Sequence, residues 1–153
     1  MMGAFLMSKR SSTSLEIKLQ VVQRCIAHTS NPTYESKQPG VYSARYAGEE
    51  KDANKNMDLV LNKLSNSANR KAHFKTVIAL NINNEQHLFT GIVEGNIRKE
   101  KFGTGGFGYD PIFEPENTGK TFAEMSLEDK NKMSHRGRAV TQLIAYLSEI
   151  ENK

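Results

Sequence analysis

The sequence predicts a mixed α/β fold in one domain. Residues 52–64 and 139–150 repeat apolar side chains at helical spacing, whereas residues 75–82 and 86–93 are β-branched runs that suit extended strands. The chain has 153 residues. A chain of this size buries roughly 70% of its unfolded surface around one core, so a second domain is not expected.

The first expected helix covers residues 15–26, where apolar side chains recur every three to four positions. Its apolar stripe consists of Leu15, Leu19, Val22 and Ile26. The Ser-Asn-Pro-Thr stretch at residues 30–33 ends it, because proline disfavours helical conformation at the residue before it. Cys25 is the only cysteine of the chain and lies within this pattern. We therefore expect a buried structural thiol and exclude an internal disulfide.

The middle of the chain changes from loop to helix to strand. Residues 39–49, PGVYSARYAGE, carry turn formers at both ends and predict a loop or a short extended piece. An amphipathic helix follows from Asp52 to Leu64. The two β-branched runs, with Asn83, Asn84 and Glu85 between them, predict a hairpin.

After the hairpin, residues 95–98 are expected to start a third strand. The glycine-rich loop at residues 103–111 follows, and a polar turn occupies residues 114–120. A final helix is expected toward the C-terminus. Its apolar positions in helical register are Ala139, Leu143, Leu147 and Ile150.

The charge and apolar patterns exclude some classes of protein. There are 21 basic and 17 acidic residues, which give a net charge of +4 that suits a polyanionic ligand but also an ordinary surface. No apolar run approaches the roughly 20 residues of a membrane-spanning helix. The opening MMGAFLM lacks the basic leader and the cleavage pattern of a signal peptide. We therefore expect a cytoplasmic protein with no membrane partner.

The loop GTGGFGYDP at residues 103–111 is the first candidate for function. Its glycines are Gly103, Gly105, Gly106 and Gly108. A tight turn needs fewer, although a turn remains the alternative, and the pattern matches neither a Walker loop nor a dinucleotide fingerprint. Phe107 and Tyr109 offer aromatic faces for stacking, and the Asp110 carboxylate can accept hydrogen bonds from a ring N–H. These groups suit a planar heterocycle.

The charged run at residues 129–138, DKNKMSHRGR, is the second candidate. Lys130, His135 and Arg136 combine donors that suit phosphate oxygens and the carbonyl edge of a base. The alternative is a solvated helix start that Ser134 caps. Together the two candidates predict a purine-nucleotide site with the loop on one side and the charged run on the other.

Three blocks in order, PGVYSARYAGE, GTGGFGYDPIFEP and TFAEMSLEDKNKMSHRGRA, resemble the inosine/xanthosine triphosphate pyrophosphatase family, the Ham1-like or RdgB-like enzymes. The resemblance implies an elongated mixed β-sheet flanked by helices, with a nucleotide cleft between two lobes. It also implies a hydrolase that converts ITP, dITP and XTP, which are noncanonical purine nucleoside triphosphates, to the monophosphate and pyrophosphate. Mg2+ is the implied cofactor, and a homodimer is the implied assembly.

The resemblance also implies roles for individual residues. The residues expected to line the base pocket are Phe107, Gly108, Tyr109 and Asp110. His135 and Arg136 are expected to contact the purine, and Lys130 to bind the nucleotide. Ser43 and Arg45 either contribute to the cleft or brace its loop.

The first 38 residues depart from the family, so residues 1–38 are interpreted as a divergent or incomplete N-terminal segment with one helix and residues 39–153 as the family body. The family's Ser/Thr-x-Asn-x-x-Lys phosphate loop and its Asp-Asp-Ser/Thr-Gly-Leu motif do not occur, and AHTSNPTYESK stands where the second is expected. Catalytic residues and metal ligands are therefore unassigned. The nearest carboxylates are Glu35, Glu49, Glu50 and Asp52.

Two alternatives follow from this departure. One is a catalytically impaired remnant that binds purine nucleotides without turnover. The other is a single-stranded nucleic-acid binder, which is disfavoured because the strands KTVIALNI and QHLFTGIV lack interleaved aromatic and basic residues. We therefore expect no nucleic-acid partner.

Overall fold

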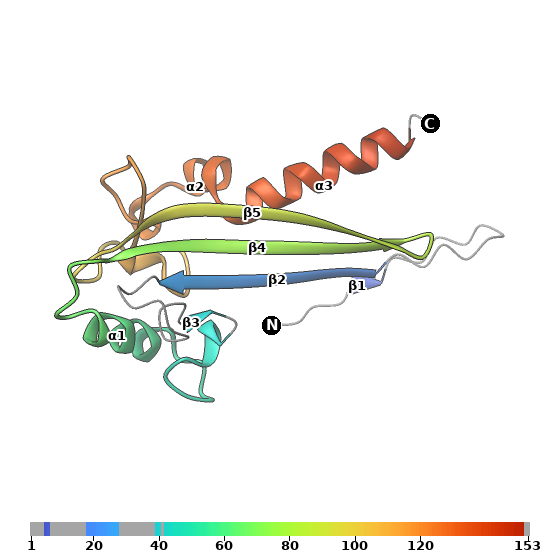
Figure 1. Cartoon of the computed structure of the whole chain (residues 1–153). Helices are drawn as coiled ribbons and strands as arrows, with labels where there is room; N and C mark the ends of the chain where they lie inside the picture. The colour runs from blue at the N-terminus through green and yellow to red at the C-terminus, as the bar shows by residue number, and fades with distance from the viewer. Residues whose placement is uncertain (1–4, 7–17, 28–38, 41, 152–153) are drawn as a thin grey trace.

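The computed structural model describes the backbone of residues 5–6 and 18–27, and backbone and side chains of residues 39–40 and 42–151. The described strands form one sheet in the order β1-β2-β4-β5-β6, with β3 paired to β2, and all pairings are antiparallel. The strands are β1 (Phe5–Leu6), β2 (Lys18–Ala27), β3 (Pro39–Gly40), β4 (Lys71–Ile82), β5 (Glu85–Ile97) and β6 (Phe113–Pro115). Figure 1 shows that β2, β4 and β5 give the sheet its elongated form.

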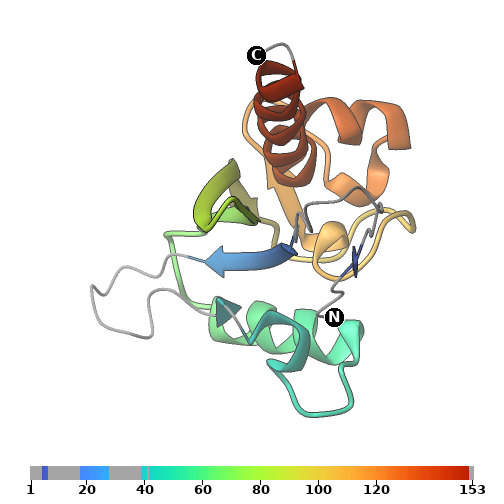
Figure 2. The ribbon, with the colours of Figure 1, turned by 90° about the vertical axis from the view of Figure 1, so that its right-hand side faces the viewer.

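Helices flank this sheet, which confirms the mixed α/β class. The helical elements are α1 (Ala53–Lys63), α2 (Leu127–Met133), α3 (His135–Glu151) and the 3-10 turns η2 (Ser43–Arg45), η3 (Asp110–Ile112) and η4 (Phe122–Glu124). In both ribbon views α3 lies on the β5 side of the sheet and α1 on the opposite side (Figures 1 and 2). Within the described part of the chain, no helix has the length and apolar character needed to cross a membrane.

Local sequence explains α1 and the hairpin, both of which are confirmed. The Asp52 carboxylate caps α1, because it accepts hydrogen bonds from the backbone N–H groups of Asn54 at 2.8 Å and Lys55 at 3.1 Å. Asn83 and Asn84 have φ angles of 51° and 63°. This left-handed conformation at both central residues matches the twist of a two-residue hairpin turn, and asparagine tolerates it well.

The expected helix at residues 15–26 is wrong. Residues 18–27 form β2, which pairs along its whole length with residues 72–81 of β4. Positions 19, 21, 25 and 27 are also apolar, so the segment fits the two-residue period of a strand, and a long partner strand decides between the two periods. The side chain of Cys25 lies outside the described residues, so its expected burial stays a prediction.

The expected third strand at residues 95–98 is also wrong, because residues 95–97 complete β5. Gly91 and Gly95 interrupt the apolar pattern, but the strand continues through both. They lie where α3 and β6 come close to the backbone of β5. A Cβ at Gly95 would overlap the Glu114 carbonyl oxygen of β6 and would lie 2.7 Å from the Phe113 ring. Glycine in the strand therefore lets β6 pair closely with it.

The buried apolar residues form two clusters along β4 and β5. The first joins α1 to the region of the glycine-rich loop and contains Met57, Val60, Leu64, Ala72, Phe74, Val93, Ile97, Tyr109, Ile112, Phe113 and Phe122. The second lies under α3 and contains Ile78, Leu80, Ile82, Phe89 and Ala139, with Leu143, Tyr146 and Leu147 against it. The final helix is thus confirmed, although Ile150 in its apolar register is 39% exposed.

Side chains of α3 cover the outer backbone edge of β5. The Gln142 amide accepts a hydrogen bond from Thr90 N–H at 3.3 Å and donates one to the Thr90 carbonyl at 2.9 Å. Arg138 donates to the Ile92 carbonyl at 2.7 Å. These bonds occupy backbone groups that an edge strand would otherwise offer to another chain, and they fix the position of α3 on the sheet.

Candidate functional site

The glycine-rich loop runs from the end of β5 to η3, and hydrogen bonds close its base. Phe102 N–H donates to the Pro111 carbonyl at 2.8 Å, and Gly105 N–H donates to the Ala123 carbonyl at 3.1 Å. Gly103 has a φ of +77°, and a Cβ there would lie 2.6 Å from the same Ala123 oxygen. The loop therefore needs glycine to approach η4 closely, which a side chain would prevent.

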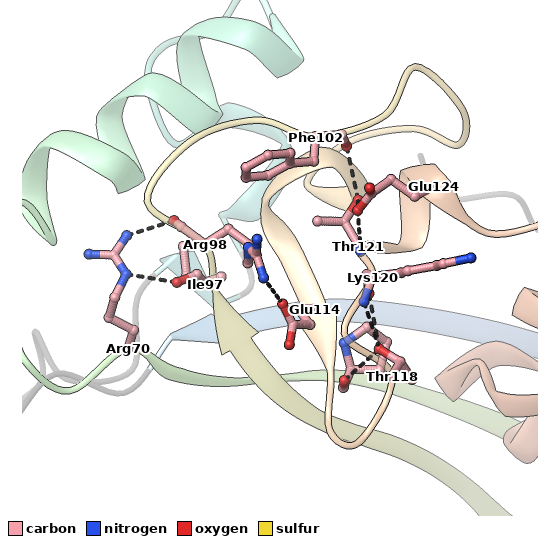
Figure 3. Close-up of polar contacts among 10 residues, drawn as sticks. Arg70, Ile97, Arg98, Phe102, Glu114, Thr118, Lys120, Thr121 and Glu124 are labelled. Carbon is pink, nitrogen blue, oxygen red and sulfur yellow. Dashed lines mark hydrogen bonds and ion pairs between the residues drawn. The ribbon is translucent and has the colours of Figure 1, made fainter.

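Polar contacts around Thr121 hold η4 against this loop (Figure 3). The buried Thr121 hydroxyl donates to the Phe102 carbonyl at 2.9 Å, and Thr121 N–H donates to the Glu124 carboxylate at 2.8 Å. That backbone hydrogen bond lowers the pKa of Glu124. The arrangement is a capping box, which satisfies backbone groups at the start of η4.

Arg70 joins the end of α1 to the end of β5, and Figure 3 shows its contacts with Ile97 and Arg98. Its guanidinium donates to the carbonyls of Leu64 at 2.6 Å, Ile97 at 2.7 Å and Arg98 at 2.7 Å. Burial lowers the pKa of Arg70. Beside it, Arg98 forms an ion pair with Glu114 of β6. This group fixes the point at which the chain leaves β5 and enters the loop.

The carboxylate of Asp110 folds back beneath the loop. It accepts a hydrogen bond from Phe107 N–H at 2.7 Å and forms an ion pair with Lys130 of α2. The side chains of Asp110 and Lys130 are 6% and 14% exposed, so the pair is largely shielded from water. A Cβ at Gly106, whose φ is +74°, would overlap this carboxylate. Gly106 therefore makes room for the ion pair.

Phe107 stands at the surface between two cations. Its ring is 57% exposed. The Lys130 Nζ lies 5.3 Å from the ring centroid and the Arg136 Cζ lies 5.0 Å from it. Both distances are within the range of a cation–π interaction. The ring thus offers an aromatic face with cationic groups beside it.

His135 begins α3 and is only 4% exposed. Its ring centroid lies 5.0 Å from that of Phe74, and neither ring nitrogen has a hydrogen-bond partner among the described residues. Burial, and then the charges of Arg136 and Lys130, lower the pKa of His135 to about 4. The imidazole is therefore neutral at pH 7 and has one donor and one acceptor nitrogen available.

These elements surround a pocket of about 400 Å³. Its lining residues are Gly106, Phe107, Asp110, Leu127, Lys130, Asn131, Ser134, His135, Arg136, Gly137 and Val140. Five of the seven residues expected to bind the nucleotide therefore meet at one pocket, whereas Gly108 and Tyr109 are not among its lining residues. Residues of the glycine-rich loop and of the charged run thus line the same pocket.

Tyr109 packs into the core, and its hydroxyl donates to the Ser43 carbonyl at 2.6 Å. This contact ties the loop to η2, so Ser43 braces the loop through its backbone. Arg45 forms an exposed ion pair with Glu49 at 3.4 Å and does not line the pocket. Gly108 has a φ of +63° with open space around it, so backbone conformation alone favours glycine there.

Sequence reasoning did not select six of the lining residues as site residues, which are Gly106, Leu127, Asn131, Ser134, Gly137 and Val140. The signal for Gly106 was available, since it lies within the glycine-rich loop. Gly137 is adjacent to the charged run's Arg136, and a Cβ there would overlap the Asn131 carbonyl oxygen of α2. Leu127 and Val140 are exposed apolar residues of α2 and α3. The sequence does not distinguish an apolar residue that lines a pocket from one on an ordinary surface.

Among the described carboxylates that the sequence suggested as metal ligands, none lines the pocket. Glu50 pairs with Lys55, and Asp52 caps α1, while Glu35 lies outside the described residues. Within residues 39–40 and 42–151, no group of three or more His, Cys, Asp or Glu is placed to hold a metal ion. Asp110, the carboxylate of the pocket, is already engaged by Lys130. The described residues therefore do not fit a protein-held magnesium site.

Comparison with known proteins finds curated relatives of similar sequence. A dITP/XTP pyrophosphatase of Flavobacterium psychrophilum is 62% identical over 109 residues, which cover 71% of this chain and 57% of that protein. One of Porphyromonas gingivalis is 52% identical over 110 residues, which cover 71% and 57%. The chain therefore spans less than three fifths of the length of these curated relatives.

Solved structures extend the similarity to three dimensions. The Staphylococcus aureus Ham1 protein superposes with a TM-score of 0.80 and 38% identity, covering 87% of this chain and 67% of that one. The model of the Ham1 family matches residues 35–146, which include the glycine-rich loop, α2 and most of α3. On the family match and the 62% identity together, the chain belongs to the Ham1 family.

Proposed function

We propose that this chain supplies the base-recognition pocket of an enzyme that hydrolyses ITP, dITP and XTP to the monophosphate and pyrophosphate, and so cleanses the nucleotide pool. The observation that carries the proposal is the buried, neutral and unpartnered His135 beside the Asp110–Lys130 pair in one pocket. The relatives of similar sequence are named dITP/XTP pyrophosphatases, which supports the same substrate class.

The pocket groups suit a purine with an oxygen at position 6. Lys130 and Arg136 carry only donors, and His135 can present one N–H. A 6-keto group accepts such hydrogen bonds, whereas the 6-amino group of adenine would leave the buried His135 N–H unpaired at a cost of about 1–3 kcal/mol. The exposed face of Phe107 offers a surface on which the base stacks. The roles of Gly108 and Tyr109 are then to set the loop conformation rather than to touch the base.

Turnover needs more than this pocket. Mg2+ supplies neutralisation of the triphosphate and of the pyrophosphate leaving group in reactions of this class. Because the described residues hold no cluster of metal ligands, we derive no catalytic step from them. The second candidate function, purine-nucleotide binding without hydrolysis, rests on the phosphate-loop and Asp-Asp-Ser/Thr-Gly-Leu motifs that do not occur in this sequence.

One experiment separates the two candidates. Pyrophosphate release from ITP, dITP, XTP, ATP and GTP is measured with Mg2+, and IMP binding is measured by calorimetry on the same preparation. Lys130→Ala removes a pocket cation, and Lys132→Ala on the same helix is its matched control, because Lys132 is 67% exposed and pairs with Glu128. Selective release from the first three substrates, lost in Lys130→Ala alone, supports the pyrophosphatase.

IMP binding without pyrophosphate release supports the second candidate. Absence of both, or equal binding of IMP and AMP, would contradict base recognition at this pocket.

The homodimer remains a proposal from the family resemblance. Light scattering on the purified chain tests it, and a monomer at micromolar concentration would overturn it.

A further inference from the structure

Thr76 is a buried polar residue that the site described above does not use. It lies in β4 with no exposed surface, and its hydroxyl oxygen has no hydrogen-bond partner among the described residues. The other buried polar side chains outside this region are all partnered. These are Asn56, Asp110, Thr121 and Ser134. Unpartnered buried atoms occur in the described part of the chain only at Thr76 and His135.

The strand register places Thr76 beneath the first turn of α3. Thr76 lies directly opposite Gly91 of β5. A Cβ at Gly91 would overlap the His135 carbonyl oxygen and would lie 2.8 Å from Ala139 N. Directly opposite residues of an antiparallel pair point to the same face, with Cβ atoms about 4.5–5.5 Å apart. The Thr76 side chain therefore points to the face on which His135 lies.

Phe74 locates the imidazole itself. It lies two residues before Thr76 in the same strand, so both side chains point to the same face of the sheet. The ring centroids of Phe74 and His135 are 5.0 Å apart. The His135 ring thus lies beside Phe74, on the face of β4 toward which Thr76 also points, so the three unpartnered polar atoms lie on one buried face. Buried polar groups are nearly always paired with each other, with water or with a ligand.

We infer that Thr76 is a positioning residue for base recognition: its hydroxyl hydrogen-bonds one ring nitrogen of His135 through one buried water. A neutral imidazole has one donor and one acceptor nitrogen. When the bridging water donates to the acceptor nitrogen, the proton is held on the other nitrogen, which then donates to the carbonyl oxygen of a bound base. Thr76 would in this way select the tautomer that favours a 6-keto purine. This role in base selection rests on the proposed function.

The tautomer can be tested without any turnover. Long-range ¹H–¹⁵N spectra of the ¹⁵N-labelled chain report the protonation of each ring nitrogen, and His135→Gln identifies the His135 signals among those of the four histidines. Thr76→Val removes the hydroxyl and keeps the shape, whereas Thr76→Ser keeps the hydroxyl. We expect one dominant tautomer in the wild type and in Thr76→Ser, and a mixture in Thr76→Val. Thr76→Ala repeats the comparison if the valine variant does not fold.

Unchanged His135 shifts in both variants that lack the hydroxyl would overturn the inference. The binding arm compares IMP with AMP by calorimetry, and we expect the preference for IMP to fall about tenfold in Thr76→Val and to be retained in Thr76→Ser, because one aligned hydrogen bond is at stake. A wild-type chain that binds no IMP would contradict the proposed function while leaving the tautomer result to stand. A tautomer change with an unchanged IMP preference would restrict Thr76 to a structural role and overturn its part in recognition.

Discussion

The Asp110–Lys130 ion pair lies where water is largely excluded, so removing one partner leaves the other charge uncompensated. We expect Lys130→Ala to lower the free energy of unfolding by about 3–5 kcal/mol, which is typical of breaking a buried pair. Lys132→Ala removes an exposed pair of the same helix and should cost less than about 1 kcal/mol. Urea unfolding measures both. Equal losses in the two variants would show that the Asp110 pair is effectively solvated.

His135 makes the stability depend on pH. Its pKa in the folded chain is about 4, below the ordinary value of 6.5, because burial and the charges of Arg136 and Lys130 oppose protonation. Between these two values the unfolded chain binds a proton that the folded chain does not. The free energy of unfolding should therefore fall by up to about 3 kcal/mol as the pH drops from 6.5 to 4.

The matched comparison for this titration is His135→Gln, which removes the titrating group. Carboxylates such as Glu124 also lose stabilising interactions at low pH, but they do so in both proteins. The difference in unfolding free energy between wild type and variant, measured in urea at pH 7, 5.5 and 4.5, isolates the His135 contribution. A constant difference across this range would contradict the lowered pKa.

Contacts between elements depend on Gly91, where β5 meets the first turn of α3. Gly91→Ala should lower the free energy of unfolding by about 1–3 kcal/mol or more, because the added methyl group would overlap the His135 carbonyl. Gly119→Ala is the control, since Gly119 has a φ of +65° but open space around it and should cost only about 1 kcal/mol. Thermal unfolding followed by circular dichroism measures both. Similar losses would mean that α3 can move away from β5.

The elements that sequence predicts well are those whose signals are local. Asp52 predicts the start of α1 because its side chain caps the backbone N–H groups that follow it. Asn83 and Asn84 predict the hairpin turn because asparagine tolerates the left-handed conformation. Residues 18–27 were mistaken for a helix because their apolar positions fit two periods, and the choice depends on pairing with a strand more than 40 residues away. Gly95 was taken to start a separate strand because β6, the strand that it lets approach closely, lies further along the chain.

At the candidate site, the glycine-rich loop and the charged run could be predicted to meet because both carry chemistry that is unusual for a surface. The inward position of Tyr109 could not be predicted from the sequence. A tyrosine in such a loop suits a stacking face equally well as a core position in which its hydroxyl donates to a backbone carbonyl. Thr76 could not be found either. Its proposed role depends on the pairing of Thr76 with Gly91 and on the packing of His135 against Gly91, and neither contact is local in sequence.

At the scale of the whole molecule, β4 and β5 run through both buried clusters, so the clusters should unfold together. Ile112 belongs to the cluster near the glycine-rich loop and Leu80 to the cluster under α3. Each is at most 1% exposed. Truncation of either to alanine should cost about 2–5 kcal/mol and should shift one common transition.

The common transition is tested by following unfolding with two probes. Far-UV circular dichroism reports the sheet and helices, and amide hydrogen exchange reports protection in each cluster separately. In wild type, Ile112→Ala and Leu80→Ala, the midpoints from both probes should coincide within each protein and move together between proteins. If Leu80→Ala instead lowered amide protection under α3 alone, the two clusters would be independent folding units. The site between η3, α2 and α3 would then open without global unfolding, because α3 alone would detach.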